Sequence, residues 1–187
     1  MSFLDALERH RRLFAELDGL EAQVVTLADQ IERSIRAGGK VVFFGNGGSA
    51  ADSQHLAAEF VVRYRAERRP LPALALTVDT SVLTAHTNDY AFETVFARQV
   101  EALCGPSDTV IGISTSGNSA NIIAGLAAAK SVGAAGWAWT GRGGGKLAET
   151  ADHLLAVPES ETARVQEAHL FIGHWICEDM DRRFAKP

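Results

Sequence analysis

The chain has 187 residues, of which 47% are hydrophobic, and this composition fits one soluble globular domain with a buried core. Its formal net charge of -5 argues against a general affinity for nucleic acid or anionic membranes, because both bind basic surfaces. Its two cysteines, Cys104 and Cys177, are far apart, so the sequence indicates neither a disulfide framework nor a thiolate zinc site.

The first 37 residues predict a helical extension. Charged side chains between Asp5 and Glu16 leave no apolar core for a signal peptide, and no later run approaches a membrane span, so we expect a cytoplasmic protein. From Leu13 to Ile31 apolar residues recur at spacings of three and four, which indicates one face of a helix. This face either packs on its own domain or, because the spacing is heptad-like, forms a seam between subunits. A homo-oligomer is therefore one of two interpretations.

Residues 38–187 predict an α/β core. Short apolar runs indicate five buried strands: Lys40 to Phe44, Ala73 to Val78, Thr109 to Ile113, Ala134 to Thr140 and Leu154 to Val157. Helix-compatible stretches are Ser49 to Arg63, Ala91 to Leu103, Ser119 to Val132 and Ala163 to Phe184. This alternation is typical of a doubly wound parallel sheet flanked by helices, with no second domain. In such a sheet ligands bind beyond the carboxyl ends of the strands.

The turn from Gly45 to Ser49 follows the first strand and opens a helix. Its glycines let the backbone approach a ligand, and free N–H groups at a helix start suit an anion. A purely structural tight turn is the alternative. With Ala50 the segment also approaches a dinucleotide fingerprint, but that motif needs an acid about 20 residues on, and Asp79 is too distant.

A second turn, from Ser114 to Ser119, again lies between a strand and a helix and contains four hydroxyls. Hydroxyls suit a phosphate monoester because each donates a hydrogen bond without adding charge. Ser119 has a structural alternative as the cap of the next helix. A third glycine cluster, Gly141 to Lys146, fails the P-loop pattern because of its spacing and because Leu147 follows the lysine, so we predict a loop there.

Two pairs of side chains are candidates for acid, base or metal chemistry. His55 and Glu59 are four residues apart and share a helix face, and Gln166 and His174 are eight apart and fall broadly on one side of the last helix. Each pair alone is weak, because such residues are more often ordinary surface or structural side chains. The cluster Arg63, Arg65, Arg68 and Arg69 brings positive charge to a phosphate or a partner or, more simply, forms a solvated helix end.

Together these segments resemble a known family over nearly the whole chain. The segments that carry the resemblance are Gly45-Asn46-Gly47-Gly48-Ser49, Gln54-His55-Leu56-Ala57-Ala58-Glu59, Asn88-Asp89-Tyr90, Gly112 to Asn121 and Thr162-Ala163-Arg164-Val165-Gln166-Glu167. The chain is similar to the sedoheptulose 7-phosphate isomerases, also called phosphoheptose isomerases, of the sugar isomerase (SIS) domain superfamily. His86 and Thr87 depart from the family pattern just before Asn88.

The resemblance implies conversion of sedoheptulose 7-phosphate to glycero-manno-heptose 7-phosphate, for bacterial surface polysaccharide, in a cytoplasmic homotetramer with one zinc per subunit and sites between subunits. The implied substrate-binding residues are Asn46, Gly47, Gly48, Ser49, Glu59, Asn88, Asp89, Ser114, Thr115, Ser116, Ser119 and Gln166. The implied zinc ligands are His55, Glu59, Gln166 and His174. The implied catalytic pair is Glu59 and His174.

This chemistry suits those side chains. Ketose-to-aldose isomerisation needs a proton taken from C1, an enediol, and a proton returned to C2. Glu59 is the expected base and His174 the expected shuttle for the hydroxyl and carbonyl protons. Zinc would polarise the carbonyl, yet a glutamate bound to zinc is a poorer base, and the sequence leaves that conflict open.

Two other functions compete with this one. A non-catalytic SIS-domain adaptor that binds the replication initiator shares the fold and glycine turns, but it is expected to lack the equivalents of Glu59 and His174. A Rossmann oxidoreductase would bind a nicotinamide dinucleotide at the first turn, although Asp79 is misplaced for that role.

Overall fold

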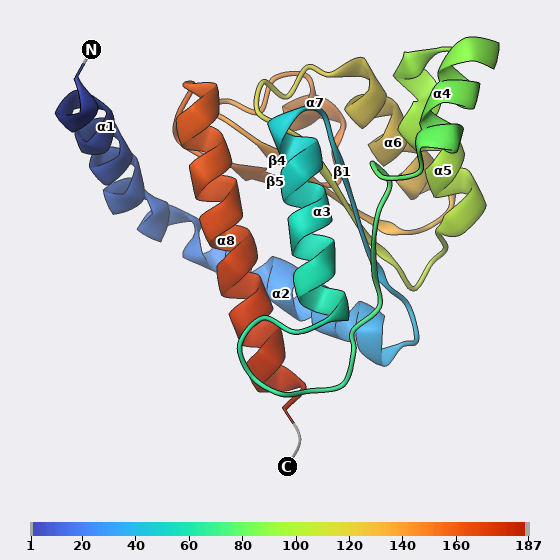
Figure 1. Cartoon of the computed structure of the whole chain (residues 1–187), viewed down its shortest axis with the longest axis horizontal. Helices are drawn as coiled ribbons and strands as arrows, with labels where there is room; N and C mark the ends of the chain where they lie inside the picture. The colour runs from blue at the N-terminus through green and yellow to red at the C-terminus, as the bar shows by residue number, and fades with distance from the viewer. Residues whose placement is uncertain (1, 186–187) are drawn as a thin grey trace.

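The computed structural model describes residues 2–185, which surround a five-stranded parallel sheet with the strand order β2-β1-β3-β4-β5 (Figure 1). The strands are β1 (Val41–Gly45), β2 (Ala73–Ala75), β3 (Thr109–Ser114), β4 (Ala135–Thr140) and β5 (His153–Ala156). Helices cover both faces of the sheet, which confirms the predicted doubly wound α/β fold with an N-terminal helical extension.

The two central strands are buried on both faces. Every residue of β1 and β3 is buried, as expected of parallel strands covered by helices. They pair from Val41 opposite Thr109 to Gly45 opposite Ile113. The two strands therefore end side by side at one edge of the sheet, where the two predicted turns begin.

Two helical layers enclose the sheet. The helices of the domain are α2 (Glu21–Arg36), α3 (Gly48–Val61), α4 (Thr80–Asp89), α5 (Val95–Leu103), α6 (Ala120–Ser131), α7 (Leu147–Thr150) and α8 (Thr162–Arg183). The layer of α2, α3 and α8 packs on a core that includes Phe43 and Trp139, whereas α5, α6 and α7 pack around Phe44 on the other face. α3 and α8 lie side by side and run in the same direction (Figure 1).

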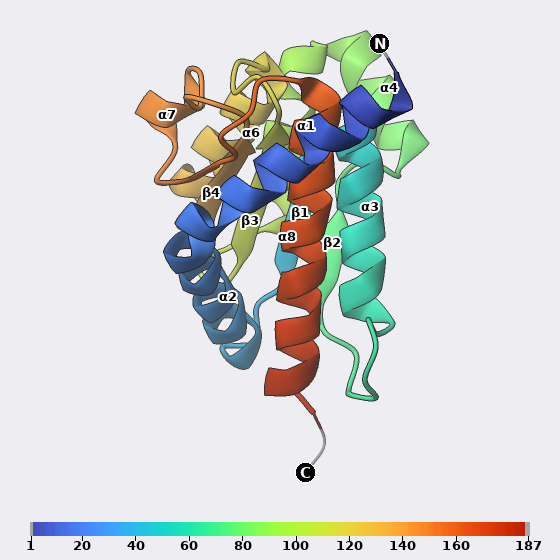
Figure 2. The same ribbon diagram turned by 90° about the vertical axis from the view of Figure 1, so that its left-hand side faces the viewer.

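The predicted N-terminal helix is two helices. α1 (Phe3–Glu16) and α2 are joined by a 3-10 turn, η1 (Leu17–Leu20), so the continuous helix expected across residues 13–31 is wrong. Leu17 and Leu20 stay buried within the turn, which explains why the apolar spacing runs through the break. Figure 2 shows α1 crossing α8 obliquely before the chain turns into α2.

Three other segments differ from expectation. The helix expected at 91–103 begins with a 3-10 turn, η2 (Phe92–Thr94), before α5, and the strand expected to reach Val78 ends at Ala75. α4 was not predicted, because His86 is its only buried residue and it lacks an apolar stripe. Within residues 2–185 we find no helix whose length and apolar character would let it cross a membrane.

Candidate active site

The two turns lie where the strand order reverses. β1 has β2 on one side and β3 on the other, so the chain leaves β1 and β3 in opposite directions across the sheet. A crevice forms at this switch point in doubly wound sheets, and ligands bind there. Both predicted phosphate turns therefore lie at the position that the topology favours for a site.

The first turn opens α3 with free main-chain donors. Gly47 is the N-cap with φ of 54°, a backbone conformation that favours glycine. In the described part of the chain, the N–H groups of Gly47 and Gly48 have no protein acceptor. A helix start with unpaired N–H groups attracts an anion through hydrogen bonds and the helix dipole.

Gln166 reaches this turn from α8. Its carboxamide lies so close to Gly48 that a Cβ at position 48 would overlap Nε2 and stand 2.9 Å from Cδ. A side chain at position 48 would therefore displace the carboxamide of Gln166 from this turn. The contact brings two residues of the implied substrate-binding set together across 118 positions of sequence.

The second turn presents hydroxyls. The Oγ atoms of Ser114 and Ser119 are 3.0 Å apart. Ser119 stands at the N-cap position of α6, but its side chain makes no capping hydrogen bond, so the structural alternative for this hydroxyl is wrong. Gly117 has φ of 67°, and a Cβ there would overlap the carbonyl oxygen of Gly144, so the third glycine cluster packs directly against this turn.

Side-chain amides fix the two turns in place. Asn46 and Asn121 form a reciprocal amide pair, with both Nδ2–Oδ1 distances at 2.9 Å, and so join the first turn to the start of α6. The Asn118 Oδ1 accepts from the N–H of Lys146, and the Leu147 N–H donates to the carbonyl of Gly117. The segment 141–146 is the predicted loop, and it supports the second turn from behind.

The acid and base candidates meet between α3 and α8. The Nε2 atoms of His55 and His174 are 2.7 Å apart, and Oε1 of Glu59 lies 3.6 Å from His55 Nε2. Gln166 is eight residues before His174, about 12 Å along the helix axis, and its amide lies at the first turn instead. Three of the four implied zinc ligands therefore face one another, while the fourth contacts the anion turn.

Burial shifts the pKa of His174 in this cluster and of Asp52 beside it. Burial lowers the pKa of His174, and the neighbouring His55 lowers it further, whereas Glu59 acts in the opposite direction. The neutral imidazole is thus favoured near neutral pH. Burial also raises the pKa of Asp52, against the effect of His55, and in residues 2–185 its Oδ2 is buried without a hydrogen-bond partner.

Three polar residues of the predicted sugar-binding segment, His86, Asn88 and Asp89, lie on α4. Asn88 and Asp89 are exposed at the end of α4, where the Asn88 Nδ2 donates to Asp89 Oδ1 over 2.9 Å. The adjacent His86 is buried and its Nε2 lies 2.8 Å from the Thr94 hydroxyl. α4 packs on α5 and η2. Within one chain, Asn88 and Asp89 are therefore on a different helix from Glu59, which belongs to α3.

One arginine departs from the predicted solvated cluster. Arg63, Arg65 and Arg69 are exposed, but the Arg68 side chain is completely buried in an ion pair with Asp181. The expectation of a solvated helix end is therefore wrong for Arg68. Its partner lies 113 residues later, so the adjacent sequence could not identify it.

The family follows from the sequence matches. A model of the SIS domain family matches residues 6–141. A phosphoheptose isomerase from Aquifex aeolicus is 53% identical over 180 residues, covering 92% of this chain and 94% of the relative. One from Roseiflexus is 55% identical over 159 residues, covering 85% and 81%. The chain belongs to the phosphoheptose isomerase family.

Solved structures agree with this assignment. The phosphoheptose isomerase from Neisseria gonorrhoeae superposes with a TM-score of 0.89 at 42% identity, over 96% of both chains. The phosphoheptose isomerase from Francisella tularensis gives a TM-score of 0.92 at 34% identity, over 97% of this chain and all of the other. The SIS fold and the role of an isomerase enzyme are thereby established for the chain.

Membership in the phosphoheptose isomerase family decides between the competing functions. The curated relatives above are named as isomerases, so the adaptor that binds the replication initiator is not favoured. The oxidoreductase needs an acid for a ribose hydroxyl, whereas Asp79 caps α4 by accepting from the N–H of Val82 at 3.0 Å. The Asp79 carboxylate is thus committed to the helix start.

Three side chains near this site were not among the predicted site residues: Asp52, Tyr64 and Asn121. Asp52 lies one helical turn before His55, a spacing that could have marked it. The position of Asn121, just after the second turn, could have marked it as well. Tyr64, which stacks on His174, follows α3 among arginines that draw attention to charge and gives no signal of its own.

Proposed function

We propose that the enzyme interconverts sedoheptulose 7-phosphate and D-glycero-D-manno-heptose 7-phosphate through an enediol. The observation that carries this is the meeting of Glu59 with two imidazoles, further along α3 from a helix start whose N–H groups are unpaired in the described residues. A base removes a proton from C1 of the ketose, the C2 carbonyl oxygen gains a proton, and the enediol then loses its C1 hydroxyl proton and gains a proton at C2. The net change moves the carbonyl from C2 to C1.

Glu59 is the proposed base and His174 the proposed shuttle between the two oxygens. Glu59 is partly buried and its carboxylate faces His55, so it is presented toward the cluster. The lowered pKa of His174 favours a neutral imidazole, which can accept a proton at one nitrogen and donate from the other. Both roles need the substrate C1–C2 end at the His174 side.

The phosphate is proposed to bind at the two turns. Gly47 and Gly48 offer N–H groups, and Ser114, Thr115, Ser116 and Ser119 offer hydroxyls. Gly48 and His55 are seven helical residues apart, about 10 Å along α3, a distance that an extended seven-carbon sugar phosphate can span. Gln166 at the first turn, with Asn46 and Ser49, would bind oxygens between the ends. Asn88 and Asp89 are the proposed partners of further sugar hydroxyls.

Zinc is proposed as the cofactor, one ion per subunit. His55, Glu59 and His174 offer nitrogen and oxygen donors that suit this metal, whereas Gln166, the implied fourth ligand, has its amide at the first turn and would have to move to join them. Within residues 2–185, no group of three or more His, Cys, Asp or Glu side chains is arranged so that it could hold a metal ion. When bound, zinc would polarise the substrate carbonyl. Elemental analysis of purified wild-type and His55→Ala protein tests the site: about one zinc per chain is expected only in the wild type.

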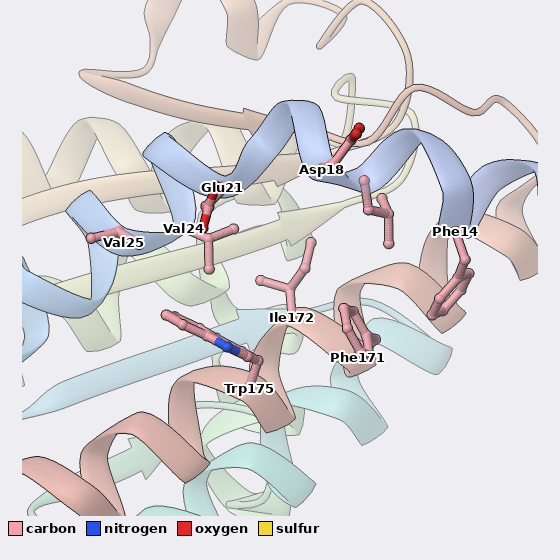
Figure 3. Close-up of a pocket in the computed structure, with 9 residues that line it drawn as sticks. Phe14, Asp18, Glu21, Val24, Val25, Phe171, Ile172 and Trp175 are labelled. Atoms are coloured by element: carbon pink, nitrogen blue, oxygen red, sulfur yellow. The ribbon is translucent and has the colours of Figure 1, made fainter.

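A homotetramer is proposed from the apolar groove between the N-terminal helices and α8. Figure 3 shows Phe14, Val25 and Phe171 around this groove, which has a volume of about 300 Å³. Phe171 is 48% exposed and lines this groove together with Phe14 and Trp175, and an apolar patch of neighbouring side chains marks an interaction surface. Light scattering should give four times the chain mass for the wild type and a lower mass for Phe171→Glu.

The biological setting is proposed from the same reaction. An aldoheptose phosphate would serve heptose synthesis for bacterial surface polysaccharide, in a cytoplasm where Cys104 and Cys177 remain thiols, as both are in the structure. Incubation of the protein with sedoheptulose 7-phosphate, with and without a chelator, tests substrate and metal together. NMR should detect the aldoheptose phosphate in the untreated sample, and its absence there would reject the proposed reaction.

A further inference from the structure

Arg68 is a buried charge beside the proposed proton-transfer residues. Its Nε donates to Asp181 Oδ1 over 2.8 Å, and the side chains of both residues are almost wholly buried. Its Nη2 and Nη1 donate to the main-chain carbonyls of Glu59 and Phe60 over 2.8 and 2.9 Å. These carbonyls belong to the last turn of α3 and have no partner within the helix. Arg68 therefore replaces a helix cap at the residue proposed as the base.

Asp181, the partner of Arg68, also binds the main chain of the segment between α3 and β2. Its Oδ2 accepts from the N–H groups of Arg65 and Ala66 over 2.6 and 2.8 Å. Burial raises the pKa of Asp181, but these N–H groups and Arg68 lower it below its usual value, so the carboxylate stays charged. Figure 1 shows this segment passing around the lower part of α8. The ion pair thus fixes residues 62–70 against both helices.

Tyr64 lies in this fixed segment and covers one face of His174. The two rings stack with centroids 5.3 Å apart and planes inclined by 25°. At its Nε2 edge, the His174 ring meets the His55 ring edge-on with centroids 5.0 Å apart. The imidazole of His174 is therefore contacted on one face by Tyr64 and at its Nε2 edge by His55.

We propose that Tyr64 is a positioning residue for His174, held in place by the Arg68–Asp181 pair. The inference rests on the proposed proton-transfer role of His174. An imidazole that rotates out of this stack loses its alignment with the substrate oxygens, and misalignment lowers the rate of the chemical step more than substrate binding. The aromatic ring of Tyr64, rather than its hydroxyl, performs this role.

Kinetics of two substitutions test the proposal. Tyr64→Leu should lower kcat about tenfold and change KM by less than about threefold. Tyr64→Phe, which keeps the ring, should have the kcat of the wild type. His153→Leu is the control, because it removes another stacked aromatic ring, on Trp137 at 4.7 Å between centroids, away from the proposed site. Wild-type kcat in Tyr64→Leu, or an equal loss in Tyr64→Phe, would overturn the proposal.

Two further measurements separate this inference from the proposed function. NMR should show the His174 ring protons shifted upfield in the wild type and in Tyr64→Phe but not in Tyr64→Leu. If the wild type fails to isomerise the substrate, the proposed function fails, and unchanged ring-proton shifts in Tyr64→Leu would separately reject the contact. Asp181→Asn should lower kcat in the wild type and add nothing in Tyr64→Leu, since both act through one ring. Additive losses would overturn the role of the ion pair.

Discussion

The carboxamide of Gln166 occupies the space that a side chain at position 48 would need, which ties α8 directly to the first residue of α3. The same two helices meet again at His55 and His174, and beyond the end of α3 Arg68 links the Glu59 carbonyl to Asp181 of α8. Because the helices are parallel, these contacts follow one another along a single seam. The proposed site therefore lies between two fixed points rather than at the end of a mobile loop.

Gly48→Ala should separate binding from stability. Gly48 has no positive φ, so alanine fits the backbone and should keep or slightly raise the melting temperature. Its Cβ would displace the Gln166 amide, and we expect KM to rise about tenfold, the loss of one good hydrogen-bonding contact. A double-mutant cycle with Gln166→Ala checks the cause. If the two losses add fully, the displaced glutamine is not the reason.

His174→Ala should leave the fold intact and nearly abolish turnover. The loss of a positioned proton-transfer group lowers kcat by about 10² to 10⁴. Steady-state kinetics and circular dichroism measure the two effects. His153→Ala on the exposed end of β5 serves as the control and should behave as the wild type. Wild-type turnover by His174→Ala would remove this residue from the mechanism.

Gly117→Ala should disrupt the second turn. It combines a φ of 67° with a clash against the Gly144 carbonyl, so we expect a loss of more than about 2 kcal/mol in the free energy of unfolding. Gly143→Ala is the matched control, because its φ is 77° but no atom lies within 4 Å of the added Cβ. That variant should lose only about 1 to 2 kcal/mol. Urea unfolding compares them, and equal losses would contradict the packing argument.

His169 should make stability depend on pH. Burial lowers its pKa from 6.5 to about 4, although its hydrogen bond to the Thr140 carbonyl raises it slightly. Between these two values the unfolded chain binds a proton that the native protein does not. Titration of His169 leaves the free energy of unfolding unchanged above pH 6.5 and lowers it by about 3 kcal/mol as the pH drops to 4. His169→Gln, which keeps an N–H donor, should flatten this part of the unfolding curve against pH. An unchanged slope in His169→Gln would assign the effect to other groups.

Periodicity and turn residues were enough to predict the sheet and its site-bearing edge. The apolar runs of β1 and β3 are continuous because both faces are covered, and glycine or hydroxyl residues mark their ends. The break at Leu17–Leu20 was not predictable, since the 3-10 turn keeps both leucines buried and preserves the spacing. α4 also escaped notice for a physical reason: an exposed helix carries no apolar stripe, although its Asp79 cap was a usable signal.

Long-range pairing limited what the sequence could say about the site. Spacing placed His55 with Glu59 on one helix and Gln166 with His174 on another, but only the parallel packing of α3 on α8 joins the pairs. The resemblance to phosphoheptose isomerases supplied their implied roles. Arg68 looked like one of four surface arginines because Asp181, which makes its burial favourable, is far away in the sequence.

The most direct test of the proton-transfer mechanism is NMR of the reaction in D₂O with wild-type and Glu59→Gln protein. The wild type should convert sedoheptulose 7-phosphate to an aldoheptose phosphate that carries deuterium at C2, because the proton added there comes from a group in exchange with solvent. Glu59→Gln should bind the substrate, as saturation-transfer signals would report, yet form no product. Product formation by Glu59→Gln at the wild-type rate, or no product from the wild type, would contradict the account.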